Sequence, residues 1–82
     1  MVAKLKWENL EKFLNIISTY DLDFQKCPKK KLYHSFKNNE YYILKNFCEI
    51  NDLINMEYGG IELTPKGKNF FNFLKKMDLI YK

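Results

Sequence analysis

The chain has 82 residues, of which 46% are hydrophobic and 17% aromatic, and its fourteen lysines against ten acidic residues give a net charge of +4. This composition suits one small folded domain with a single core and excludes a disordered chain. No apolar run approaches the roughly 20 residues of a membrane span and no apolar signal segment begins the chain, so we expect a cytoplasmic protein without a membrane partner.

Apolar residues at helical spacing predict a first helix from Lys6 to about Tyr20. Its inward side would comprise Trp7, Leu10, Phe13, Leu14, Ile17 and Tyr20. Pro28 suits the first position of a short second helix that extends to Phe36.

A third helix is predicted from Asn39 to Asn51, because Asn38 or Asn39 can accept hydrogen bonds from the free amides at its start. Its inward residues would be Tyr41, Leu44, Phe47 and Cys48, and its outward residues Tyr42, Lys45, Asn46 and Glu49.

Alternating apolar and polar residues from 54 to 63 predict a β-hairpin with a two-residue turn at Gly59-Gly60. In this register Glu57 faces Glu62, and these like charges would repel each other and also phosphates. Such a hairpin is a poor candidate for a DNA groove and would suit a basic protein surface, unless neighbouring lysines relieve the repulsion.

Thr64 and Pro65 predict the start of a last helix, as its cap and its first residue. Its buried stripe would be Phe70, Phe73, Leu74 and Met77. Gly67 in the first turn costs roughly 1 kcal/mol relative to alanine, which indicates close backbone packing at this position.

The second half of the chain resembles prokaryotic winged-helix transcriptional regulators. The matching stretch is NDLINMEYGGIELTPKGKNFF, 51–71, with Asp52 where the family usually has the glycine of "GLI" and with the family's "LT-x-x-G" at Leu63 to Gly67. The resemblance implies a mainly α fold with a small β-hairpin, a winged helix-turn-helix in one domain spanning residues 1–82. It also implies binding of double-stranded DNA by a small transcriptional regulator, with the third helix in the major groove.

A basic segment between Gln25 and Asn39 contains five lysines and no acidic residue. The lysines are Lys26, Lys29, Lys30, Lys31 and Lys37. They are interpreted either as a solvated helix face or as contacts to DNA phosphates.

The resemblance implies base reading from the third helix, for which the candidates are Asn39, Tyr42, Lys45 and Asn46. Asparagine can bond adenine and lysine can reach guanine, but the chain has no arginine for the bidentate guanine contact. Sequence specificity would then be modest or would lean toward A·T-rich sites.

The last helix has a wide apolar surface, which either lies across the core or forms a homodimer interface, as terminal helices of the family often do. The interface candidates are Phe70, Phe71, Phe73, Met77 and Tyr81. Two other functions stay open: a protein-interaction module, such as a viral or plasmid-encoded adaptor or inhibitor that does not bind DNA, and sequence-independent coating of DNA.

Residues that carry catalytic or metal chemistry are sparse. Cys27 and Cys48 lie far apart, and His34 is the single histidine, so neither a zinc site nor a redox pair is indicated; Cys48 is interpreted as a core residue and Cys27 as incidental. Asp21 and Asp23 are typical of a turn, and no phosphate-binding glycine loop occurs. We expect no enzymatic activity, no metal, no cofactor and no effector pocket.

Overall fold

The structure is a computed structural model that describes residues 5–37 and 39–81, with side chains described as far as Met77. In this part of the chain four helices and one antiparallel hairpin follow each other as α1 (Trp7–Leu22), α2 (Lys29–Ser35), α3 (Glu40–Ile50), β1 (Ile54–Glu57), β2 (Gly60–Leu63) and α4 (Pro65–Tyr81). The predicted element order and the mainly helical class with a small hairpin are confirmed. None of the helices in the described ranges combines the length and the apolar character that crossing a membrane requires.

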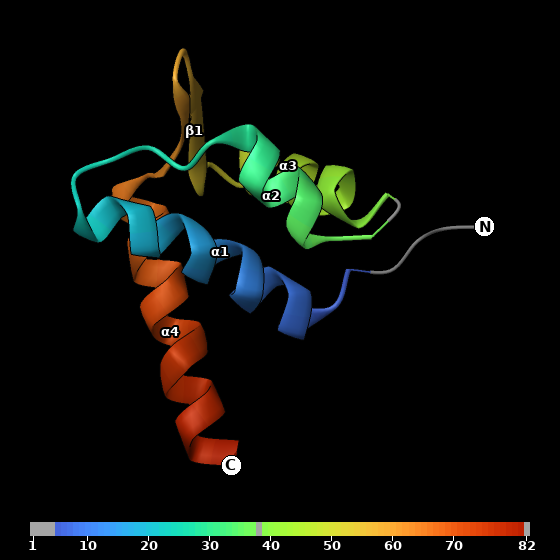
Figure 1. Cartoon of the computed structure of the whole chain (residues 1–82). Coiled ribbons are helices and arrows are strands. Elements are labelled where there is room, and N and C mark those ends of the chain that lie inside the picture. The colour runs from blue at the N-terminus through green and yellow to red at the C-terminus, as the bar shows by residue number, and fades with distance from the viewer. Residues whose placement is uncertain (1–4, 38, 82) are drawn as a thin grey trace.

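Helix α1 lies between the other elements, with α2 and α3 on one side and α4 on the other (Figure 1). Its buried side chains are Leu10, Phe13, Leu14 and Ile17, as the helical spacing predicts. Trp7 is an exception, because 62% of it is exposed. It stands in the first turn of α1, where its ring lies 6.4 Å from that of Phe70 on α4.

Helix α3 ends in a turn at Asp52, the residue that stands where the sequences it resembles usually have glycine. Asp52 adopts a left-handed conformation with φ of 57°. Its N–H donates to the carbonyl of Glu49 at 3.1 Å, and the N–H of Leu53 donates to that of Cys48 at 2.8 Å. This pair of bonds is a Schellman motif, in which glycine fits the left-handed position without strain.

The hairpin has a different register from the predicted one. Glu57 pairs with Gly60, so the two-residue turn is Tyr58-Gly59 and not Gly59-Gly60. Glu62 faces Asn55, and the predicted pairing of Glu62 with Glu57 is wrong.

The register follows from a backbone contact between β2 and the segment before α2. The N–H and C=O groups of Cys27 and Ile61 exchange two hydrogen bonds of 2.8 Å. A Cβ atom on Gly60 would lie 2.6 Å from the carbonyl oxygen of Cys27, so glycine is needed inside the strand. Gly59, in the turn, has φ of 126°, which favours glycine as well. Cys27 is fully buried, and the interpretation of Cys27 as incidental is wrong.

The start of α4 packs directly on the turn after α3. The hydroxyl of Thr64 accepts a hydrogen bond from the N–H of Gly67 at 2.9 Å, so the predicted cap is confirmed. A Cβ atom on Gly67 would overlap the carbonyl oxygen of Leu53 and lie 2.9 Å from its carbonyl carbon. The close packing predicted for Gly67 is therefore confirmed.

This contact also sets the rotation of α4. Phe71 and Leu74, four and seven residues after Gly67, lie on the same side of the helix and are buried. Phe73 and Met77 are exposed instead, and the buried stripe predicted through them is wrong. The sequence offers apolar residues on both sides, and only the position of the glycine distinguishes the side that faces the core.

Candidate nucleic-acid interface

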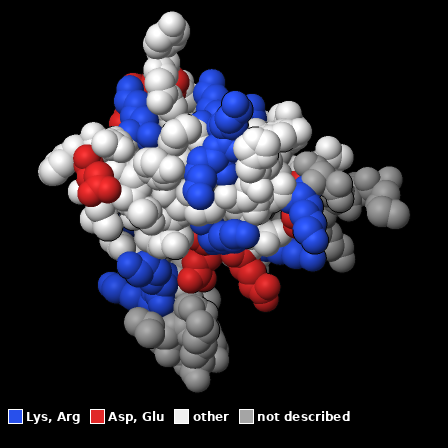
Figure 2. Space-filling model, viewed as in Figure 1, with Lys and Arg blue, Asp and Glu red and all other residues white. Residues whose placement is uncertain are grey.

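Lysine side chains gather over α2 on one face of the molecule (Figure 2). Helix α2 is short, and Leu32 is its buried residue, while Lys29, Lys30 and Lys31 are all exposed. Lys37, just after the helix, is exposed as well. The hydrogen-bonded Cys27 holds the start of α2 against the hairpin, and thereby fixes where these lysines stand.

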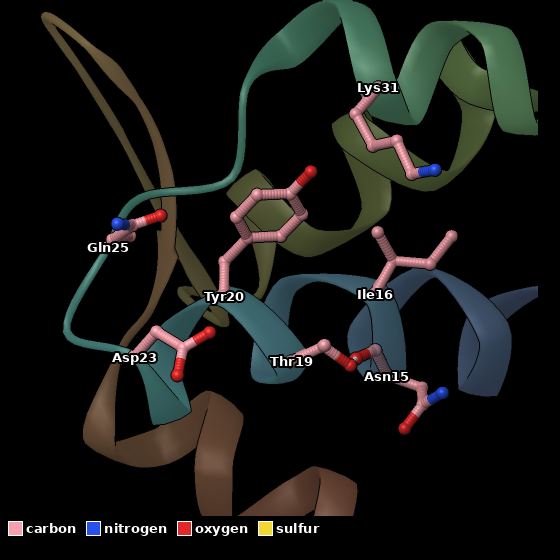
Figure 3. Close-up of a pocket in the computed structure, with 7 residues that line it drawn as sticks. All are labelled: Asn15, Ile16, Thr19, Tyr20, Asp23, Gln25 and Lys31. Carbon is pink, nitrogen blue, oxygen red and sulfur yellow. Dashed lines mark hydrogen bonds between the residues drawn. The ribbon is translucent and has the colours of Figure 1, made fainter.

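Lys29 and Lys31 do not share a face. In an α-helix two residues that are two positions apart differ in direction by about 160°. Lys31 extends over α1 and borders a hollow of about 400 Å³ between α1 and α2 (Figure 3). The hollow is lined by Asn15, Ile16, Thr19, Tyr20, Asp23, Gln25 and Lys31. The sequence did not indicate this hollow, which Lys31 borders and the other two lysines of α2 do not.

Lys29 and Lys30 instead lie beside the tip of the hairpin. They border a second, open hollow of about 370 Å³, which they share with residues 57–60 and Pro28. Tyr58, in the turn of the hairpin, is fully exposed next to it. Two cations from α2 and one aromatic ring from the hairpin therefore surround one concave surface.

Lys26 is engaged with the hairpin. Its ammonium group donates a hydrogen bond to the carboxylate of Glu57 and forms an ion pair with it. The hydrogen bond raises the pKa of Lys26 and lowers the pKa of Glu57. The pair offsets the negative charge near the hairpin tip, and it leaves Lys26 less available for a phosphate than Lys29 or Lys30.

The base-reading candidates of α3 fall into two groups. Asn39, Tyr42 and Asn46 are exposed. Lys45 keeps only 25% of its side chain exposed and forms an ion pair with Glu49, at 3.3 Å between Nζ and Oε1. The exposed polar side of α3 therefore comprises Tyr42, Asn46 and Glu49, with Asn39 just before the helix.

The predicted capping role of Asn39 is wrong, because its side chain makes no capping hydrogen bond. The carboxylate of Glu40 accepts the N–H of Lys37 at 3.1 Å and the side-chain amide of Asn9 at 2.7 Å, and so connects the start of α3 to α1. Asn38, the other capping candidate, lies outside the described residues. The side chain of Asn39 is thus not occupied in holding its own helix.

A cluster of four aromatic rings at the junction of α2 and α3 was missed from the sequence. It consists of Tyr33, His34, Tyr41 and Tyr42, whose neighbouring rings meet edge to face. The signal in the sequence was the presence of two adjacent aromatic pairs, at 33–34 and 41–42. Of these four residues, the sequence analysis named Tyr42 alone as a candidate for DNA contact.

The candidate residues for a dimer interface differ in exposure. Phe71 belongs to the core, and the side chain of Tyr81 lies outside the described residues. Phe70, Phe73 and Met77 are partly or largely exposed, and the rings of Phe70 and Phe73 stack at 6.5 Å. Together with the exposed Trp7, which the sequence analysis placed inside, they form an apolar patch that we call the Trp7 patch.

The two thiols lie away from solvent. Burial raises the pKa of Cys27 to about 11 and that of Cys48 to about 12, so both are protonated at neutral pH and poor nucleophiles. Among the described residues, no three histidine, cysteine or acidic side chains gather as metal ligands would.

Comparisons of the chain with family models, with curated proteins and with solved structures find no match. The surfaces of α2, α3 and the hairpin are therefore the basis for a functional proposal.

Proposed function

We propose that the protein is a winged helix-turn-helix domain that binds double-stranded DNA as a small cytoplasmic transcriptional regulator. The observation that carries the proposal is the position of Lys29 and Lys30, which stand exposed on α2 beside the hairpin tip. In this arrangement the lysines contact phosphates while α3 enters the major groove.

Three local features support the winged-helix arrangement. Cys27 bridges to Ile61, so that the segment before α2 extends the hairpin by one short strand-like contact. Asp52 adopts the positive φ that the family's glycine provides. Thr64 and Gly67 fasten α4 to the turn after α3, which gives the "LT-x-x-G" motif a structural reason.

The hairpin also suits DNA better than its predicted register implied. Glu57 is bonded to Lys26, and Glu62 faces the neutral Asn55. In this register the two glutamates are not paired across the strands, although their side chains remain neighbours beside Lys26, and the tip presents Tyr58 next to two lysines. We assign the hairpin a contact with the DNA backbone.

Base contacts are assigned to Asn39, Tyr42 and Asn46, because all three are exposed on or just before α3. Asparagine can donate to and accept from the edge of adenine at once. Lys45 contributes less, because reaching a base requires breaking its ion pair with Glu49.

A homodimer through the Trp7 patch completes the proposal. Tryptophan and phenylalanine in an exposed cluster are typical of protein interfaces, and a second copy would double the number of phosphate contacts. Sedimentation of the wild type and of Trp7→Ala tests it: a dimer that dissociates in the variant supports the interface, and a monomeric wild type overturns it.

One observation favours a protein-interaction module as the second candidate. Phe24, after the end of α1, has φ of 57° and is 99% exposed. A bulky residue in a left-handed conformation is strained, and such strain is concentrated at functional positions. Leu22 is also exposed nearby in the chain, so this corner offers apolar side chains to a partner.

Fluorescence anisotropy separates the two candidates. The protein is titrated into a pool of random duplexes and into an A·T-rich duplex, each at low and at physiological salt. Binding that persists at physiological salt and differs between the two DNAs supports a sequence-reading regulator, and equal binding supports nonspecific coating. Absence of binding even at low salt would overturn DNA binding and favour the protein-interaction module.

A further inference from the structure

The aromatic cluster at the α2–α3 junction is built around one buried ring. Tyr41 is buried, and its centroid lies 5.7 Å from that of Tyr33 and 5.1 Å from that of Tyr42. Tyr33 and Tyr42 are 6.1 Å apart, and 48% and 47% of these two residues are exposed. Tyr41 therefore anchors two rings whose outer halves are open to solvent.

The exposed rings share helix faces with the cations and the polar residues of the proposed DNA surface. On α2, Tyr33 follows Lys29 by four residues and His34 follows Lys30 by four, a spacing that puts each pair on one face. On α3, Tyr42 precedes Asn46 by four residues. Aromatic rings beside a row of lysines are typical of surfaces that bind unpaired nucleic acid, where bases stack on the rings and lysines hold the phosphates.

We propose that Tyr33, together with Tyr42, stacks against unpaired bases, so that the protein prefers DNA with a locally opened segment to a fully paired duplex. This inference rests on the proposed DNA binding at the same surface and names the form of DNA that it takes. In a paired duplex the faces of the bases are covered by their neighbours, whereas an unpaired base can leave the stack and lie on a tyrosine ring. Each stacked base contributes a gain in affinity of roughly 5- to 150-fold.

The rings also hold α2 against α3, so the test has to separate stacking from packing. Tyr33→Phe keeps the ring and loses only the hydroxyl, while Tyr33→Leu keeps an apolar side chain and loses the ring. Phe24→Leu is the control, because Phe24 is an exposed aromatic residue after the end of α1, outside the cluster and outside the surface assigned to DNA. Thermal unfolding followed by circular dichroism verifies that each variant is folded.

The experiment compares two labelled DNAs by fluorescence anisotropy at one salt concentration: a duplex, and the same duplex with a short central bubble of mismatched bases. Wild-type protein is expected to bind the bubble about tenfold more tightly than the duplex. Tyr33→Leu should lose about fivefold or more of its affinity for the bubble and less than about twofold for the duplex. Tyr33→Phe and Phe24→Leu should keep the preference for the bubble.

The outcomes distinguish this inference from the proposal on which it rests. Equal affinity for bubble and duplex, or a preference that survives Tyr33→Leu in folded protein, would overturn stacking and leave duplex binding intact. Binding of the bubble alone, lost in Tyr33→Leu, would support stacking and overturn double-stranded DNA as the ligand. Absence of binding to both DNAs would overturn both.

Discussion

The junction of α3, the hairpin and α4 differs from the surface of α2 and α3 in how tightly each residue is constrained. At the junction, Leu53, Thr64 and Gly67 are buried and held by backbone contacts, so each has a structural reason. On the surface, Lys29 and Asn46 are exposed and contribute little to the fold. The contrast teaches that the family-like motif in this chain explains the architecture, while the proposed function depends on residues outside it.

The largest expected effect is at the junction. Gly67→Ala would place a methyl group against the carbonyl of Leu53, and relief requires α4 to move from the turn. We expect the free energy of unfolding to fall by about 3 kcal/mol or more, measured by urea denaturation. Lys66→Ala, at the preceding and exposed position, should change it by less than about 0.5 kcal/mol. Similar losses in both variants would show that the contact with Leu53 is not what requires glycine.

On the surface the opposite behaviour is expected. Replacing Lys29 and Lys30 together by alanine should weaken DNA binding about tenfold at low salt, similarly for all sequences, and flatten its salt dependence. The unfolding free energy of the double variant should stay within about 0.5 kcal/mol of the wild-type value, because both lysines are exposed.

The matched control for that double variant is replacement of Lys66 and Lys76, which are exposed lysines of α4. It changes the net charge by the same amount but leaves the surface of α2 intact. Equal weakening in both double variants would mean that net charge, and not the position of the α2 lysines, determines the binding. Lys31→Ala should weaken DNA binding less than Lys29→Ala or Lys30→Ala, because Lys31 points over the hollow beside α1.

Where local signals decide the structure, the sequence was sufficient. Thr64, Pro65 and Gly67 predicted the start and the close packing of α4, since a cap and its helix are neighbours in the chain. The hairpin register was mispredicted because it depends on Cys27, more than thirty residues before Ile61. The same limit applies to the surface: Tyr33 and Tyr42 are brought together by α2–α3 packing, which spacing within one helix cannot show.

A smaller effect on stability is expected at the end of α3, where the backbone conformation constrains Asp52. Asp52→Gly should raise the free energy of unfolding by about 0.5–1 kcal/mol, because glycine adopts the left-handed conformation without steric cost. Asn51→Gly is the control: Asn51 has φ of −91° and donates from its side chain to the carbonyl of Phe47 at 2.8 Å, so glycine there should destabilise the protein. Destabilisation by Asp52→Gly would indicate that the aspartate side chain contributes more than its backbone strain costs.

The smallest expected effect concerns the ion pair that links the two regions, Lys26 with Glu57. Because the hydrogen bond from Lys26 lowers the pKa of Glu57, the pair stabilises the fold above the usual carboxyl pKa, and this contribution is lost as the pH falls through the lowered value. Glu57→Gln should therefore lower the unfolding temperature slightly at pH 7 and leave it close to wild type in acid, where the carboxyl of both folded and unfolded wild type is protonated. Glu8→Gln, at an exposed position in the first turn of α1, is the control in thermal scans at both pH values. A difference in unfolding temperature between Glu57→Gln and wild type that persists unchanged in acid would show that the side chain acts through packing or a neutral hydrogen bond. In that case, the charge of Glu57 would not be what connects Lys26, before α2, to the hairpin.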